Sequence, residues 1–279
     1  MFQVLSSSQS IYRRVVPIFP AALALSMFGW NKDNEETKPA DPDLAAIKQA
    51  DVLYNLKNDK NSSEEEAVKN LHAHLVEYKN CENSELLWRL ARASRDLANL
   101  STTDAETKKA LTYEAFDSAK KSLNLNEENF ACHKWYAITL SDVGEYEGTK
   151  QKISNAYEIQ KHFKKAIELN PLDATCYHLL GLWCFSITDV PWYQLKIAAA
   201  IFETPPSSSF EEAIDYFERA ERLDANFYSM NQLMLGKAYL RLNKKEEALR
   251  WLEKLSKFTS KTEEDEKAKT EAKELLKKC

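Results

Sequence analysis

The sequence predicts an all-α fold in the form of an α-solenoid, a stack of irregular helical hairpins with inserted helices and a C-terminal capping helix. Three observations predict it. Glycine occurs only 5 times in 279 residues, whereas folds built on tight turns need more of it because such turns require positive φ. Alanine, leucine, glutamate and lysine, all good helix formers, dominate the chain. Amphipathic segments with a common internal spacing follow one another from Asp43 onward.

The first 30 residues differ from the rest of the chain. They contain no acidic residue, two arginines (Arg13 and Arg14), several serines and an apolar run over 15–30 that two prolines interrupt. An Arg-rich, Ser-rich and acid-free composition is typical of a mitochondrial targeting segment. We therefore expect residues 1–30 to target an organelle or to anchor the chain at a membrane. A disordered cytosolic tail and a secretory signal are the alternatives.

Residues 31–42 are polar and contain proline, which is typical of a linker. The remaining residues, 43–279, are expected to form one helical-repeat domain. Its clearest repeat reads LMLGKAYLRLNKKEEALRWLEK (233–254), with Gly236 and Ala248 twelve residues apart. Small residues at this spacing let the two helices of a hairpin cross closely, and the pattern is that of a tetratricopeptide repeat.

Other segments repeat parts of this pattern. Two candidate first helices of hairpins span 133–144 and 176–185, and three candidate second helices span 117–127, 161–171 and 215–225. The first helices each place a small residue at the expected crossing position. The sequence therefore predicts four to five hairpins rather than a single repeat.

The repeats are irregular. Gly181 lies much more than twelve residues before Ala213, so an insertion of roughly 20 residues is expected over 186–209. A smaller insertion follows Gly144, and the charged tail over 259–279 is typical of a capping helix with one solvated face.

Composition and motifs argue against several functions. The formal net charge of −5 argues against a nucleic-acid-binding protein. The five cysteines include no CxxC pair, and His72 and His74 point to different helix faces, so no metal site is expected. The chain contains no HExxH, GxSxG or P-loop motif. We therefore expect a non-enzymatic protein without a cofactor.

Four segments carry a specific family resemblance: ELLWRLARASRDL (85–97), HKWYAITLSDVGEYEG (133–148), FKKAIELNPLDAT (163–175) and DVPWYQLKIAAAIFETPPSSSFEEAIDYFERAE (189–221). They resemble the regulator of microtubule dynamics family over about residues 43–260. The inserted PWYQ…TPPSS segment makes the match specific, because it is foreign to a generic tetratricopeptide pattern. The short N-terminus is most similar to the small soluble-type member of that family.

The resemblance implies a tetratricopeptide-like scaffold that binds microtubules and regulates their dynamics, including at the spindle. It places the protein in the cytoplasm, on the cytoskeleton and at spindle poles, with tubulin as its partner. The alternative is a mitochondrial protein associated with the membrane, which binds or transfers a phospholipid in the groove of the helical repeats. A third hypothesis is an adaptor that captures the terminal carboxylate of a peptide.

Six basic residues are candidates for partner binding. Arg89, Arg92 and Arg95 recur at three-residue spacing, which places them on one helix face as a basic stripe. Such a stripe would attract the acidic tails of tubulin. The alternative is pairing with nearby acids such as Glu85 and Asp96. Further candidates of the same kind are Lys134, Lys150 and Lys152.

The large insertion is apolar on more than one face of its expected helix. A helix that is apolar all round must be buried or must face lipid. It could pack into the superhelix, line a ligand groove or contact a membrane. The candidate groove-lining residues are Trp192, Tyr193, Leu195, Ile197 and Phe202.

Overall fold

The computed structural model describes residues 41–57, 63–202, 204–260 and 262–277. This part of the chain holds thirteen α-helices and no β-strand, which confirms the predicted all-α class. The expected targeting segment 1–30 and most of the linker lie outside the described residues. The helices are α1 (Pro42–Leu56), α2 (Glu64–Val76), α3 (Ser84–Ala98), α4 (Ala105–Leu125), α5 (Phe130–Glu147), α6 (Thr149–Ser154), α7 (Ala156–Leu169), α8 (Ala174–Thr188), α9 (Trp192–Ile201), α10 (Phe210–Leu223), α11 (Ser229–Arg241), α12 (Lys245–Ser256) and α13 (Glu263–Leu276).

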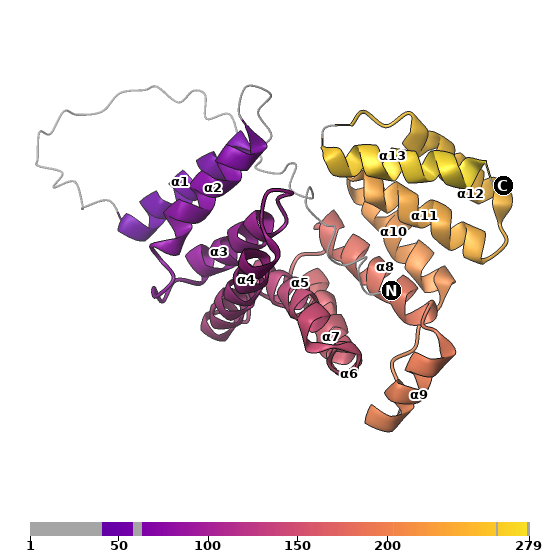
Figure 1. Cartoon of the computed structure of the whole chain (residues 1–279), viewed down its shortest axis with the longest axis horizontal. Coiled ribbons are helices and arrows are strands. Elements are labelled where there is room, and N and C mark those ends of the chain that lie inside the picture. The colour runs from indigo at the N-terminus through magenta and orange to yellow at the C-terminus, as the bar shows by residue number, and fades with distance from the viewer. Residues whose placement is uncertain (1–40, 58–62, 203, 261, 278–279) are drawn as a thin grey trace, which may run out of the picture.

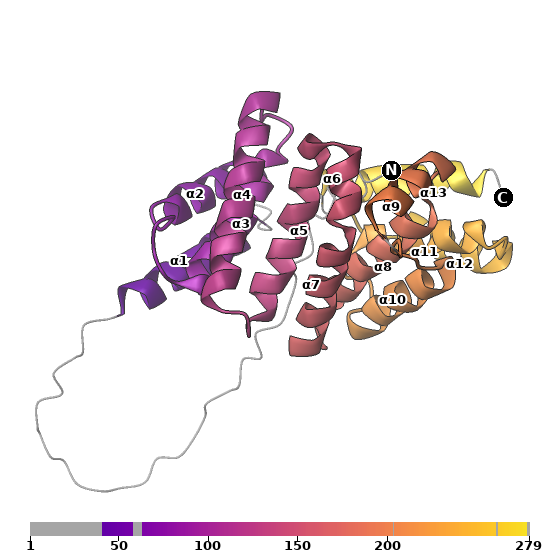
Figure 2. The same ribbon diagram turned by 90° about the horizontal axis from the view of Figure 1, so that it is seen from below.

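The described helices pair into five antiparallel hairpins. The hairpins stack side by side, as Figures 1 and 2 show. The pairs are α1 with α2, α3 with α4, α5 with α7, α8 with α10, and α11 with α12. Helix α13 packs on α11 and α12 and ends the stack. The predicted solenoid of irregular hairpins with a capping helix is therefore confirmed. The two expected insertions appear as the extra helices α6 and α9.

Polar side chains define where most helices begin. A side-chain oxygen of the residue before the helix accepts a hydrogen bond from a backbone N–H of the first turn, which would otherwise lack a partner. Thr262 and Asp265 form a reciprocal capping box at the start of α13. Between α5 and α6 the chain turns at Gly148, whose φ of 86° suits glycine. The capping residues of this kind are Asp41, Ser63, Asn83, Asp104, Asn129, Asp173, Ser209 and Thr262.

Two glycines mark the places where paired helices cross most closely. A Cβ added at Gly236 would lie 2.6 Å from a methyl carbon of Leu252 on α12. A Cβ at Gly181 would lie 2.7 Å from two ring carbons of Phe217 on α10. Both distances are shorter than a normal carbon–carbon contact. The crossing role predicted for Gly236 and Gly181 is therefore confirmed.

The main hydrophobic core runs through the middle of the stack. Helix α8 is its centre, because fourteen of its fifteen residues are buried. Trp135 of α5 and Trp183 of α8 lie in this core, and Tyr136 is packed against it. Within the described residues, no helix combines the length and the apolar character that crossing a membrane requires.

Candidate functional site

Arg89, the first residue of the predicted basic stripe, is buried between two helices. Its guanidinium donates to Asp51 of α1 at 2.9 and 3.0 Å and to the Glu85 carboxylate at 2.6 Å. Only 9% of the residue is exposed. Burial alone would lower the pKa of Arg89, but the two carboxylates raise it above its ordinary value. Arg89 therefore joins the first hairpin to the second.

Arg92 and Arg95 are buried further, at 3% and 2% exposed. The Arg95 guanidinium donates to Asp142 of α5 at 2.5 Å, and this pair joins the second hairpin to the third. Arg92 stacks on the ring of Tyr54 of α1, 3.6 Å from its centroid. Cations at such distances are attracted by the electron-rich face of the ring.

Lys134 is fully buried and, like Arg89 and Arg95, pairs with an acid of the neighbouring hairpin. Its ammonium donates to Asp173 at 2.7 Å, which joins α5 to the start of α8. Burial alone would raise the pKa of Asp173, but Lys134 beside it holds that pKa below its ordinary value. Asp173 also accepts from the backbone N–H of Cys176, so one carboxylate both caps α8 and holds the neighbouring hairpin.

The pairs Arg89–Asp51, Arg95–Asp142 and Lys134–Asp173 are called the inter-repeat ion pairs below. They correct the expectation of an exposed basic stripe on α3: the three arginines and Lys134 lie inside the stack. The acidic partners were missed because they lie 38 to 47 residues away along the chain. Glu85, the alternative partner of Arg89 considered from the sequence, does pair with it.

The two lysines of α6 differ from each other. Lys150 is exposed, whereas Lys152 pairs with Glu145 at the end of α5. Two further exposed lysines, Lys161 and Lys164, lie on the adjoining helix α7. The sequence pattern offered no signal for these two, because they belong to an ordinary amphipathic helix with acids interspersed.

The apolar residues of the large insertion lie mostly at the surface. Trp192, Tyr193 and Leu195 of α9 are 68%, 51% and 49% exposed. These three side chains are therefore not packed into the superhelix, which was one of the alternatives expected for the insertion. Ile197 and Phe202 are half-buried, and the Phe202 ring meets the ring of Tyr157 edge-on at a centroid distance of 5.1 Å. Helix α9 is thus attached to the stack along one side only.

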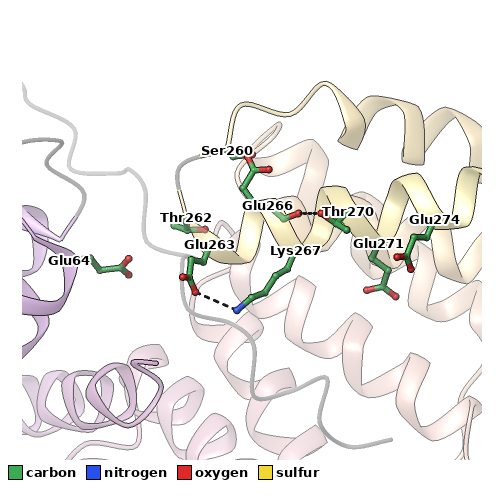
Figure 3. Close-up of a pocket in the computed structure, with 9 residues that line it drawn as sticks. All are labelled: Glu64, Ser260, Thr262, Glu263, Glu266, Lys267, Thr270, Glu271 and Glu274. Carbon is green, nitrogen blue, oxygen red and sulfur yellow. Dashed lines mark hydrogen bonds and ion pairs between the residues drawn. The ribbon is translucent and has the colours of Figure 1, made fainter. Parts of the chain in front are cut away.

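A wide hollow lies between the start of α2 and the exposed face of α13, with a volume of about 960 Å³. Figure 3 shows Glu64 of α2 facing α13, which contributes four glutamates and only one lysine to the lining. Lys267 is bound to Glu263. The surface is therefore acidic and would repel an acidic partner. Its lining residues are Glu64, Ser260, Thr262, Glu263, Glu266, Lys267, Thr270, Glu271 and Glu274.

Burial shifts the pKa values of several cysteines and histidines in the core. Burial raises the pKa of the Cys132 and Cys184 thiols to about 11, so both are protonated and poor nucleophiles at neutral pH. His133 and His162 stack with 2.6 Å between their Nδ1 atoms, and burial lowers the pKa of each. Across the described part of the chain, no cluster of three or more histidines, cysteines or acids could hold a metal ion.

Comparison with solved structures supports the repeat fold. A thermophilic TPR protein from Thermus thermophilus superposes with a TM-score of 0.54 and 15% sequence identity, over 84% of this chain and 98% of that one. At this identity the likeness shows the fold alone. The hairpin stack is therefore of the tetratricopeptide type.

Comparison with curated sequences identifies close relatives. Regulator of microtubule dynamics protein 1 from Pongo abelii is 58% identical over 206 residues, which cover 74% of this chain and 66% of that protein. The Mus musculus protein 1 is 54% identical over 230 residues, 82% of this chain and 72% of its own length. Regulator of microtubule dynamics protein 3 from Xenopus laevis is 35% identical over 195 residues, which cover 70% of this chain and 42% of that protein. The chain thus spans about two thirds of the protein 1 relatives.

The family profile described as regulator of microtubule dynamics protein 1-3 matches residues 46–279, nearly the whole helical domain. The inserted helices α6 and α9 and the inter-repeat ion pairs all lie inside this range. The resemblance inferred from the four sequence segments is therefore confirmed, and this chain belongs to the regulator of microtubule dynamics family.

Proposed function

We propose that this chain is a non-enzymatic scaffold that binds microtubules and regulates their dynamics, including at the spindle. Family membership is the observation that carries the proposal, because the relatives are named as regulators of microtubule dynamics. The fold supports it, since stacked helical hairpins present extended surfaces that proteins of this architecture use for binding. The proposal places the protein in the cytoplasm, on the cytoskeleton and at spindle poles.

The exposed lysines of α6 and α7 form a surface that suits an acidic partner. Lys150, Lys161 and Lys164 lie on neighbouring helices that contact each other. The buried arginines of α3 are engaged in ion pairs or ring stacking. Acidic tails such as those of tubulin would meet attraction at these lysines and repulsion at the acidic hollow beside α13.

Co-sedimentation of the full chain with polymerised tubulin across a salt series tests the proposal. Binding should weaken as salt rises, because exposed charges are screened within roughly 8 Å at physiological ionic strength. The triple variant K150E/K161E/K164E should lose most of its co-sedimentation and keep its melting temperature, since the three side chains are exposed.

The variant K244E/K245E/K257E is a matched control, because it makes the same change in net charge on exposed lysines at the other end of the stack. It should retain microtubule binding. Equal loss in both triple variants would show that only net charge matters and would overturn the assignment to α6 and α7. A wild-type chain that stays in the supernatant at low salt would overturn the microtubule scaffold itself.

A further inference from the structure

We propose that α9, supported by α6, is a docking surface for an anionic lipid membrane, on which α9 lies without crossing the bilayer. The helix has ten residues, whereas spanning the hydrocarbon core takes about 20. In Figure 1 both helices lie along the lower edge of the stack of hairpins. The tests of this surface change Trp192, Leu195 and Lys196, which the microtubule proposal does not use, and leave Lys150 of α6, which both proposals use, unchanged.

One face of α9 is attached and the opposite face is free. The less exposed positions recur at helical spacing, and α9 packs mainly on α6. These positions are Gln194, Ile197, Ala198 and Ile201. Trp192 and Leu195 lie on the other side, three residues apart, and are 68% and 49% exposed. Large apolar side chains gathered at one exposed place mark an interaction surface rather than ordinary scatter.

The aromatic residues suit the boundary between water and lipid. Trp192 and Tyr193 stand together at the start of α9, with centroids 6.2 Å apart. Both side chains combine an apolar ring with a polar group, and for that reason they gather at the headgroup level of membranes. Lys196 lies 4.9 Å above the Trp192 ring, so a cation accompanies the apolar surface.

The positive charge on α6 and α9 favours an anionic lipid membrane as the binding partner of this surface. Helices α6 and α9 contain no acidic residue and present two exposed lysines, Lys150 and Lys196, whereas Lys152 is paired with Glu145. Lysines near an anionic membrane are attracted to its surface. An acidic polypeptide tail would satisfy the lysines but would leave Trp192 and Leu195 in water. An anionic membrane provides both the charge and an apolar layer for these side chains.

The test uses the full chain and vesicles of phosphatidylcholine with and without phosphatidylserine, in a flotation assay. Wild type should bind the vesicles that contain phosphatidylserine more strongly. The variants W192A/L195A and K196E should reduce that binding, the first by roughly tenfold or more because two apolar anchors are lost. The matched control is L44A/L172A, which truncates two exposed leucines (48% and 76% exposed) far from α9.

A second readout separates α9 from the apolar run in residues 1–30, which could itself contact lipid. Brominated acyl chains quench the fluorescence of tryptophans that reach them. The difference between wild type and W192F isolates Trp192, because every other tryptophan is present in both chains. We expect the bound wild type to be quenched strongly and W192F to lose a large share of the quenching while it still binds.

Three results would overturn the proposal. Equal quenching in wild type and W192F would place α9 away from the lipid. If vesicle binding changed neither with phosphatidylserine nor with K196E, the proposed preference for anionic lipid would be wrong. A wild-type dimer that W192A/L195A converts to a monomer, without vesicle binding by either, would assign the surface to a second copy of the chain. Microtubule co-sedimentation of W192A/L195A in lipid-free buffer should be unchanged, so the two proposals fail separately.

Discussion

Helices α8 and α9 are neighbours in the chain with similar composition and opposite environments. Helix α8 contains no charged residue, and α9 contains only Lys196. Yet fourteen of fifteen residues are buried in α8, and only Ala198 is buried in α9. Helix α8 lies between α7, α10 and α11, whereas α9 packs mainly on α6. Apolar composition alone therefore does not decide whether a helix becomes core or surface.

The difference comes from how many neighbours each helix has. A hairpin helix inside a stack is covered by its partner and by the hairpins on both sides. An inserted helix is outside that repeating geometry and finds a partner on one side. The apolar face left over on α9 is available for binding, while the same kind of face on α8 stabilises the fold. The following predictions test this contrast, from the largest expected effect to the smallest.

The variant K134M should be the most damaging, because it leaves Asp173 at the start of α8 without its buried cation. Removing one partner of a buried ion pair costs about 3–5 kcal/mol. Urea denaturation monitored by circular dichroism measures the free energy of unfolding. The matched change K196M on α9 should alter it by less than about 0.5 kcal/mol, because Lys196 is exposed. Equal stability of K134M and wild type would mean that the pair contributes nothing.

His178 should make α8 sensitive to acid. Burial lowers the pKa of His178 to about 4, although a hydrogen bond to Asn231 opposes the shift. Between pH 6.5 and pH 4 the unfolded chain therefore binds a proton that the folded chain does not, and stability falls as pH falls. Between pH 6.5 and pH 4 the free energy of unfolding of wild type should fall by about 3 kcal/mol more than that of H178N.

The measurement for His178 is the urea midpoint at several pH values. Asparagine at position 178 can still donate to Asn231 but does not titrate, so H178N is the control for all other groups. Parallel pH profiles of the two chains would contradict the prediction. No corresponding effect is expected from α9, which contains no histidine, cysteine or acid.

The variant G181A should show how tightly α8 crosses α10. The added Cβ would stand 2.7 Å from the Phe217 ring, and overpacking of this kind costs about 1–3 kcal/mol. Alanine also favours the helix by up to about 1 kcal/mol over glycine. The net destabilisation should be about 1 kcal/mol, measured as a lower melting temperature. The control on α9 is A199L, which should leave the melting temperature unchanged because Ala199 is exposed. If G181A were instead more stable than wild type, the Phe217 ring would have to move aside at little cost.

The smallest effect on stability is expected for W192A/L195A. Both side chains are largely exposed in the folded chain, so truncating them should change the free energy of unfolding by less than about 0.5 kcal/mol. Thermal melting followed by circular dichroism checks this. A clear loss of stability would show that α9 is part of the core and would remove the contrast with α8.

Much of the fold could be predicted from local spacing. The crossing of α11 and α12 at Gly236, the two insertions and the capping helix all follow from patterns within about 35 residues, the length of one hairpin repeat. The partner surface could not be predicted in this way. Three-residue spacing correctly placed Arg89, Arg92 and Arg95 on one helix, but it does not reveal what covers that helix.

The sequence by itself determined the helical class, the hairpin pairing and the family, because these depend on small and large residues at fixed spacing along one chain segment. Only the tertiary structure decided which charges are buried and which apolar residues are exposed. Asp142 and Asp173 reach Arg95 and Lys134 only after successive hairpins stack, and α9 remains exposed only because the stack leaves it outside. Burial is a property of neighbours in space, and a solenoid brings together neighbours that are a whole repeat apart in sequence.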